Sequence, residues 1–143
     1  MELQNLLNKQ IANFALTYFK LHRFHWYIEG AEFYQLHTVF QTLYEEQTTF
    51  LDEFAERLLA IDGKPASTMA EYLKLSSLSE DGTEKKTKEI MNALINDFTK
   101  IASELKEGIS IAEKEEDHIT TDLLIRTKEI LEKHVWMFKQ TAK

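Results

Sequence analysis

The near absence of helix-breaking residues constrains the fold of this sequence more than any other feature. The 143 residues include only four glycines and one proline, which are the residues that most often interrupt helices and strands. A chain with so few of them is expected to consist of a small number of long elements, and long elements are helices. The length suits one well-buried core, so residues 1–143 are expected to form a single domain.

Four segments repeat apolar residues at spacings of three and four, the pattern of a helix with one buried face. The first carries this pattern over residues 7–21, and Gly30 follows as a helix-ending residue. The second, residues 33–62, contains neither Gly nor Pro and would be roughly 45 Å long at about 1.5 Å per residue. The third covers 90–112 and the fourth about 120–140.

The connection between the second and third helices is long and polar. Gly63 and Pro65 end the second helix, and the stretch to Gly82 has room for only a short helix around residues 69–73. Such a crossover allows helices 2 and 3 to run parallel. The sequence therefore predicts an all-α fold, the ferritin-like four-helix bundle with a long crossover between helices 2 and 3.

The composition limits which macromolecules and metal ions this protein is expected to bind. The net charge of −7, with no strongly basic tail, disfavours binding to DNA or to acidic membrane surfaces. We find neither a signal-peptide pattern nor an apolar run long enough to span a membrane, so we expect a soluble, cytoplasmic protein. Without cysteine, any transition metal must be held by histidine and carboxylate oxygens, which suit iron, manganese or zinc.

Four residues are candidate metal ligands: His25, His37, Asp52 and Glu56. Asp52 and Glu56, four positions apart, share one helix face. His37 and Asp52, however, are separated by roughly 22 Å along the same helix, while a shared ion needs ligands at about 2 Å. An intra-bundle di-iron centre needs two Glu-x-x-His patterns, and this chain has one, Glu115 to His118.

Two copies of the second helix could close that gap by crossing antiparallel at a two-fold axis. Positions 37 and 56 have the same midpoint as positions 41 and 52, so one crossing brings His37 near Glu56 of the mate and position 41 near its Asp52. A second, semi-polar stripe supports such an interface. It consists of His37, Gln41, Tyr44, Thr48, Asp52, Ala55 and Leu59.

Each feature also has a simpler interpretation. A single core-facing His25 is commonly a hydrogen-bonded interior residue, and an acidic pair such as Asp52 and Glu56 is commonly a solvated helix face. Trp26 and Tyr27 fit a packing role, with electron relay beside an iron site as the alternative. The shared midpoint favours the metal site over the separate structural roles.

Three segments closely resemble the signature of the Dps mini-ferritins: FHWYIEGAEFYQLH, LDEFAERLLAIDGKPASTMAEYL and the C-terminal KHVWMF. The resemblance covers essentially the whole chain as one ferritin-like domain. It implies a homododecameric hollow shell that oxidises Fe(II), preferably with hydrogen peroxide, and stores the ferric mineral, which protects the cell from oxidative damage. It also implies ferroxidase sites at two-fold interfaces.

The resemblance assigns His25 and His37 as iron ligands from one subunit, and Asp52 and Glu56 as ligands from its mate. Gln41 departs from the family, which usually has an acid at this position. The iron site built on His25, Asp52 and Glu56 is therefore expected to be intact, and the second site to be weakened. The family also has acid-lined three-fold pores, for which the candidate residues here are Glu113, Asp117 and Asp122. The alternative interpretation of these acids is a solvated helix junction. His118 lies in the same run and would weaken the attraction of such a pore for Fe(II).

The sequence leaves three possible functions to compare. The leading one is an iron store with ferroxidase activity, whose substrates are iron and hydrogen peroxide. The alternative is a nucleoid protein that coats DNA and has weak or no ferroxidase activity. The acidic charge of the chain argues against this alternative, because it makes DNA an unlikely partner. A third is a shell that has lost iron oxidation through Gln41 and binds another divalent ion.

Overall fold

The computed structural model describes residues 2–143, and within that range it contains five α-helices and no β-strand. The helices are α1 (Glu2–Tyr27), α2 (Phe33–Ala60), α3 (Met69–Leu75), α4 (Thr87–Lys114) and α5 (His118–Thr141). The four long helices form the predicted bundle, and α3 is the short helix predicted in the crossover, two residues longer at its carboxyl end than expected.

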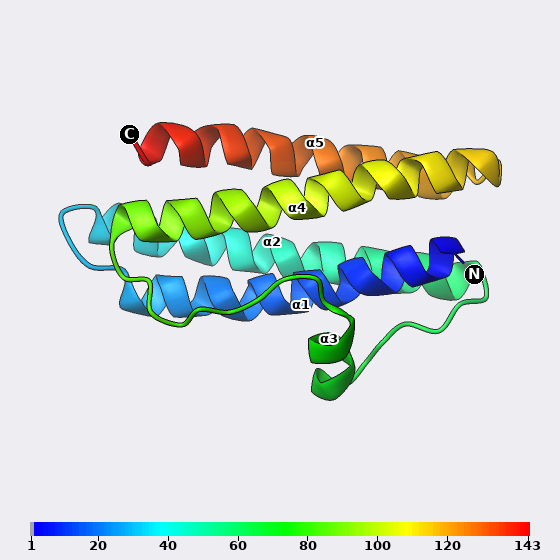
Figure 1. The fold of residues 1–143 in the computed structure, drawn as a ribbon, viewed down its shortest axis with the longest axis horizontal. Coiled ribbons are helices and arrows are strands. Elements are labelled where there is room, and N and C mark those ends of the chain that lie inside the picture. Colours follow the sequence, from blue (N-terminus) through cyan, green and yellow to red (C-terminus); the bar gives the residue numbers. More distant parts are fainter. Residues whose placement is uncertain (1) are drawn as a thin grey trace.

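The bundle is built from two antiparallel helix pairs (Figure 1). One pair is α1 with α2 and the other is α4 with α5, each joined by a short turn. The crossover carries the chain from the end of α2, beside the start of α1, back along the outside of α1 to the start of α4 at the other end of the bundle. As a result α2 and α4 run parallel, as the sequence predicted.

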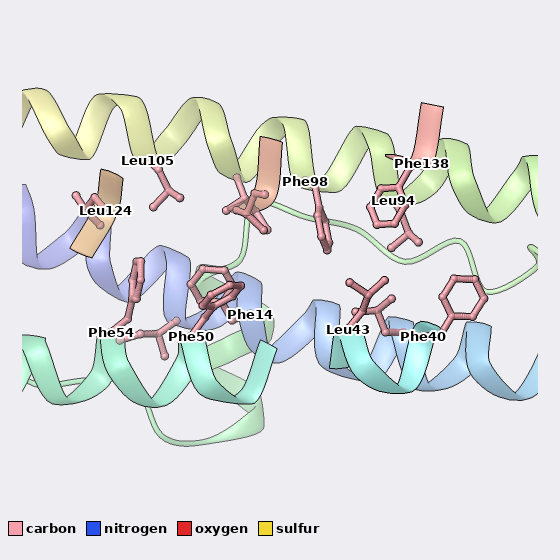
Figure 2. Close-up of a cluster of buried hydrophobic side chains, with 14 of the residues drawn as sticks. Phe14, Phe40, Leu43, Phe50, Phe54, Leu94, Phe98, Leu105, Leu124 and Phe138 are labelled. Atoms are coloured by element: carbon pink, nitrogen blue, oxygen red, sulfur yellow. The ribbon is translucent and has the colours of Figure 1, made fainter. Parts of the chain in front are cut away.

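Aromatic side chains from both helix pairs fill the centre of the bundle (Figure 2). Phe14 of α1 packs edge-on against Phe54 of α2, with ring centroids 5.0 Å apart. Phe98 of α4 packs in a similar way against Phe138 of α5, at 5.3 Å. Burying each such ring contributes roughly 1.5–3 kcal/mol. The core therefore fixes how α1 and α2 lie against each other, and these two helices carry the candidate ligands.

The end of α2 differs in detail from the prediction. The helix stops at Ala60, and the residue in the left-handed conformation is Asp62, with φ 66°. Gly63 does not take this conformation but lies close against Leu58, and its N–H donates to the Leu58 carbonyl at 2.8 Å. A Cβ atom at position 63 would lie 2.2 Å from the Leu58 side chain. Only glycine permits this close approach, which starts the crossover.

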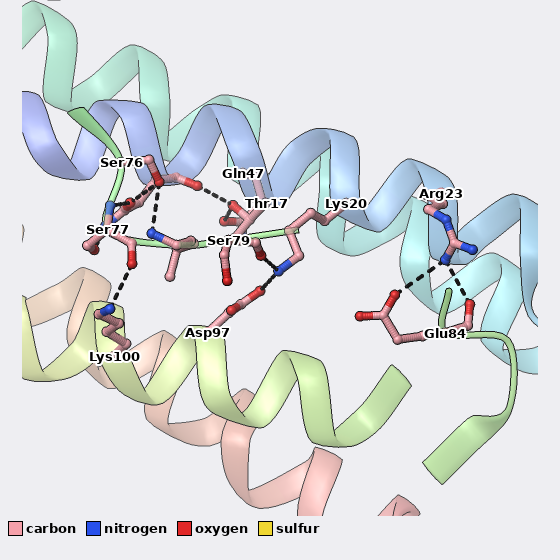
Figure 3. Close-up of polar contacts among 12 residues, drawn as sticks. Thr17, Lys20, Arg23, Gln47, Ser76, Ser77, Ser79, Glu84, Asp97 and Lys100 are labelled. Atoms are coloured by element: carbon pink, nitrogen blue, oxygen red, sulfur yellow. Dashed lines mark hydrogen bonds and ion pairs between the residues drawn. The ribbon is translucent and has the colours of Figure 1, made fainter. Parts of the chain in front are cut away.

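Polar side chains of α1 hold the crossover in place along its length (Figure 3). The contacts are the Ser77 N–H to Asn13 Oδ1 at 2.9 Å, Lys20 Nζ to the Ser79 carbonyl at 2.7 Å, and Arg23 Nη1 to the Glu84 carbonyl at 2.7 Å. Lys20 also reaches the Asp97 carboxylate of α4 at 2.5 Å. The long connection is thus an ordered strap across the outside of α1.

Candidate metal centre

His25 and His37 meet at the end of the bundle where α1 turns into α2. His25 lies in the last turn of α1 and is 8% exposed, and His37 lies half-buried in the second turn of α2. Their rings stack nearly parallel, with centroids 3.6 Å apart and an interplanar angle of 13°. The first two candidate ligands are therefore side by side within one chain.

Each of these two rings is held by the backbone of the other residue. The Nδ1 atom of His25 lies 2.6 Å from the His37 carbonyl oxygen, and the Nδ1 atom of His37 lies 2.7 Å from the His25 carbonyl oxygen. A carbonyl oxygen only accepts hydrogen bonds, so both Nδ1 atoms carry the proton and donate. In the neutral rings Nε2 then keeps its lone pair, the arrangement that a metal-binding histidine requires.

Aromatic rings surround the histidine pair. Phe33, the first residue of α2, lies nearly parallel to the His37 ring, with centroids 5.1 Å apart and an angle of 21°. Tyr44 meets the His25 ring edge-on at 5.5 Å and stacks on the His22 ring at 3.7 Å. The ligand rings are thus enclosed on several sides by other rings.

His22, Phe33 and Tyr44 did not emerge as site residues from the sequence. Burial, and secondarily the neighbouring His25, lower the pKa of His22, which favours the neutral form of its ring. Helical spacing offered a signal that could have found them: His22 precedes His25 by three positions and Phe33 precedes His37 by four. Tyr44 already lay on the semi-polar stripe.

The candidate carboxylates lie elsewhere on the same chain. Asp52 and Glu56 are exposed on α2, fifteen and nineteen positions beyond His37. A straight helix separates His37 from Asp52 by about 22 Å, so these acids do not join the histidines within one chain. Gln41 is also exposed, and its Nε2 donates to Glu45 at 3.2 Å.

The interior of the bundle provides no alternative centre. Across residues 2–143, no three His, Asp or Glu side chains are grouped so that they could hold a metal ion. Two polar pairs lie in or near the interior, and in each the two side chains bind each other: the half-buried His134 Nε2 lies 2.7 Å from Glu46, and the buried Asp97 is paired with Lys20. Each pair supplies too few free ligands for a structural or catalytic ion.

The three candidate pore residues lie around the turn between α4 and α5, in different environments. Glu113 is exposed, and Asp122 is exposed with a 3.0 Å contact to Arg126. Asp117 is the N-cap of α5: its carboxylate accepts from the Thr120 N–H at 3.0 Å and from Arg57 at 3.0 Å. The charge of Asp117 is therefore largely engaged within its own subunit, whereas Glu113 is free of such contacts among the described residues.

The histidines of α1 and α2 lie at one end of a ferritin-like bundle, and comparisons with known proteins agree with that class. The family model named Ferritin, described as "Ferritin-like domain", matches residues 4–143. A curated relative, DNA protection during starvation protein 2 of Bacillus anthracis, is 44% identical over 134 residues, which cover 94% of this chain and 92% of the relative.

Two solved structures have the same fold. The Dps crystal structure from Staphylococcus aureus matches with a TM-score of 0.96 and 38% identity, covering 99% of this chain and 95% of that one. A Dps protein from Vibrio cholerae O1, described as a member of a broad superfamily of ferritin-like diiron-carboxylate proteins, matches with a TM-score of 0.96 and 29% identity, covering 99% and 89%.

This chain belongs to the Dps family of ferritin-like proteins. The resemblance seen in its sequence signature is thereby confirmed, as is the predicted all-α ferritin-like fold. Within residues 2–143, no helix is both long and apolar enough to cross a membrane.

Proposed function

We propose that this protein is a ferroxidase and iron store that oxidises Fe(II) at sites shared between two subunits. The observation that carries the proposal is the histidine pair, in which both Nδ1 atoms are engaged with carbonyls and both Nε2 atoms remain to bind metal. Among residues 2–143, no third His, Asp or Glu side chain joins the pair. Membership of a family related to diiron-carboxylate proteins supports iron as the ion.

Asp52 and Glu56 complete the site from the two-fold mate in this proposal. Both are exposed in the single chain. Asp52 lies on the stripe that also carries Gln41 and the exposed Leu59, and Glu56 follows Asp52 by four positions on the same helix face. An antiparallel crossing of two α2 helices sets His37 opposite Glu56 of the mate and Gln41 opposite its Asp52. Carboxylate oxygens and imidazole nitrogens together form a ligand set that suits iron.

The proposed reaction consumes Fe(II) and hydrogen peroxide together. Two Fe(II) ions lose one electron each, and the O–O bond of one hydrogen peroxide molecule breaks. With two water molecules, the products are two units of ferric oxyhydroxide and four protons. The carboxylates of Asp52 and Glu56 offset the positive charge, the histidines fix the positions of the ions, and subunit contact excludes bulk water. Two-electron reduction releases no hydroxyl radical.

The decisive experiment measures Fe(II) oxidation by hydrogen peroxide in metal-free protein, by absorbance of the ferric product. The wild type is compared with Asp52→Ala and with Glu107→Ala, which changes an exposed acid on α4, a helix that carries none of the proposed ligands. We expect Asp52→Ala to lose most of the protein-dependent rate and Glu107→Ala to retain it. Equal rates in all three proteins would show that the shared site does not operate.

The shell is the second part of the proposal. A dodecamer of 16.8 kDa subunits would have a mass of about 200 kDa. Sedimentation of the purified protein measures this directly. Glu113 is the better candidate to guide Fe(II) through a three-fold pore, since Asp117 is paired with Arg57 and Asp122 with Arg126. Glu113→Gln should slow iron uptake by the shell, and an unchanged uptake rate would remove it from that role.

DNA binding is the second candidate function. The relative from Bacillus anthracis is named for DNA protection. That name gives no support to the expectation that DNA is an unlikely partner. Protection can follow from coating DNA or from removing iron and peroxide, and the net charge of −7 favours removal. A gel-shift titration on duplex DNA at increasing salt separates the two, because tight binding at physiological salt would establish coating.

A further inference from the structure

Phe33 and His25 are both stacking neighbours of the His37 ring. The His37 centroid is 3.6 Å from that of His25 and 5.1 Å from that of Phe33, and both pairs are within about 21° of parallel. Phe33 is also packed against the hydrophobic core. It therefore links the orientation of a proposed ligand to the packed interior of the bundle.

The start of α2 needs such support because it lacks the usual stabilisation of a helix end. Its N-cap residue, Glu32, makes no side-chain hydrogen bond to the first turn, and that turn contains no acidic residue. The first four N–H groups of a helix have no partners within the helix, so an uncapped first turn tends to fray. His37 lies only four positions after the first helical residue.

We propose that Phe33 is a positioning residue for metal binding, which stacks on the His37 imidazole and holds its Nε2 atom ready for an ion. The proposal rests on the function proposed above. The hydrogen bond from His37 Nδ1 to the His25 carbonyl fixes one atom of the ring, but the ring can still rotate about that contact. Stacking on Phe33 restricts this rotation, as outer-shell partners of metal-binding histidines do elsewhere.

The test uses Co(II), whose visible absorption reports the number and geometry of its ligands. Metal-free, assembled protein is titrated as wild type and as Phe33→Leu, and His37→Ala marks the affinity left when the ligand is removed. We expect Phe33→Leu to bind Co(II) on the order of tenfold more weakly, with reduced absorption, as for lost outer-shell partners. Phe33→Tyr, which keeps the ring, should restore both.

Phe24→Leu is the matched control. Phe24 is a buried phenylalanine at the same end of the bundle that packs against Phe40, with centroids 6.2 Å apart, and it is not among the stacking neighbours of His37. We expect it to lower stability at least as much as Phe33→Leu, because Phe24 is fully buried and Phe33 only partly, and to leave Co(II) affinity unchanged. If Phe33→Leu loses its helical circular dichroism, Phe33→Met replaces it, since methionine fills similar volume without a planar ring.

The outcomes separate this inference from the proposed function. Co(II) binding that is unchanged in both His25→Ala and His37→Ala would overturn the proposed site itself. Wild-type binding that depends on His37, with equal affinity in Phe33→Leu, would overturn only the role of Phe33. Equal weakening by Phe33→Leu and Phe24→Leu would also overturn it, because loss of packing alone would then explain the effect.

Discussion

The rings of His25 and His37 each donate a hydrogen bond to the backbone carbonyl of the other residue, at 2.6 and 2.7 Å. These reciprocal contacts join the last turn of α1 to the second turn of α2 and set both rings in the same tautomer. One half of the proposed metal site is therefore formed before any second subunit arrives. The other half, Asp52 and Glu56, lies exposed further along α2.

A site divided in this way can be rebuilt from two inactive chains. His25→Ala damages the histidine half and Asp52→Ala damages the carboxylate half, so each homodimer should have little activity. A mixed dimer has one site with both halves intact and one with neither. Random mixing after disassembly should restore roughly a quarter of the wild-type peroxide-dependent oxidation rate, since half of the dimers are mixed and each has one intact site.

The control for that mixing experiment is His25→Ala combined with His37→Ala chains. Both variants damage the same half of the site, so no mixed dimer has an intact histidine pair. Recovery in this control, or its absence in the first mixture, would mean that the ligands do not come from two subunits.

Gln41→Asp should strengthen the second ion site. The Gln41 side chain is exposed and donates to Glu45 at 3.2 Å, and its amide oxygen is a weaker ligand than a carboxylate. An added negative charge within ligand distance of an ion should lower the dissociation constant of the weaker Co(II) site by on the order of tenfold. Gln41→Leu is the size-matched control. Identical Co(II) titrations of wild type and Gln41→Asp would show that position 41 does not face an ion.

The sequence predicted the helices well because their signals are local. Spacings of three and four identified the buried faces, and the rarity of Gly and Pro predicted the length of the helices. The prediction for the end of α2 was less accurate: the helix stops at Ala60, short of the predicted residue 62, because Asp62 takes the left-handed conformation and Gly63 contacts Leu58. Such contacts arise in three dimensions and leave no periodic signal.

The candidate site was predictable in its ligands but not in its supports. Spacing singled out His25 and His37, yet their reciprocal hydrogen bonds depend on how the turn between α1 and α2 brings the two carbonyls to the rings. Similarly, Asp117 looked like one acid in an acidic run, whereas its contacts with Thr120 and Arg57 give it a structural role. A run of charges in sequence does not specify which ones already have partners.

Asp117 should contribute stability that acid removes. Burial opposes ionisation of its carboxyl, but hydrogen bonds from Thr120 and the charge of Arg57 outweigh it and hold the pKa below the usual value. An acid with a lowered pKa in the folded state stabilises the protein above its unfolded pKa of about 3.9, and this contribution is lost as the pH falls through the folded pKa. Asp117→Ala should cost about 1–2 kcal/mol near neutral pH and progressively less below about pH 4.

Asp117→Asn provides the comparison for that prediction, because asparagine keeps the N-cap and removes the charge. Its loss of stability at neutral pH should be smaller than that of the alanine variant. The measurement is urea denaturation followed by circular dichroism, at matched protein concentration from pH 3 to 7. A constant difference between wild type and Asp117→Ala over this range would contradict the assigned role of the carboxylate.

The Lys20–Asp97 pair inside the bundle should show the opposite dependence on pH once its cation is removed. Burial raises the pKa of Asp97, although its hydrogen bond and ion pair with Lys20 act against that rise. Lys20→Met leaves the carboxylate buried without a cation, which should cost about 3–5 kcal/mol near neutral pH. A raised folded-state pKa stabilises below the unfolded value of about 3.9, so the stability of this variant should fall as the pH rises from about 4.

The double variant Lys20→Met with Asp97→Leu distinguishes loss of the ion pair from loss of the strap. It removes both charges, so the pH dependence due to Asp97 should disappear and most of the stability should return, since apolar replacement of a buried ion pair is often neutral. The contact from Lys20 Nζ to the Ser79 carbonyl is lost in both variants. If the double variant were as unstable as Lys20→Met, the strap contact would account for the effect, because an unpaired Asp97 charge is present in only one of the two proteins.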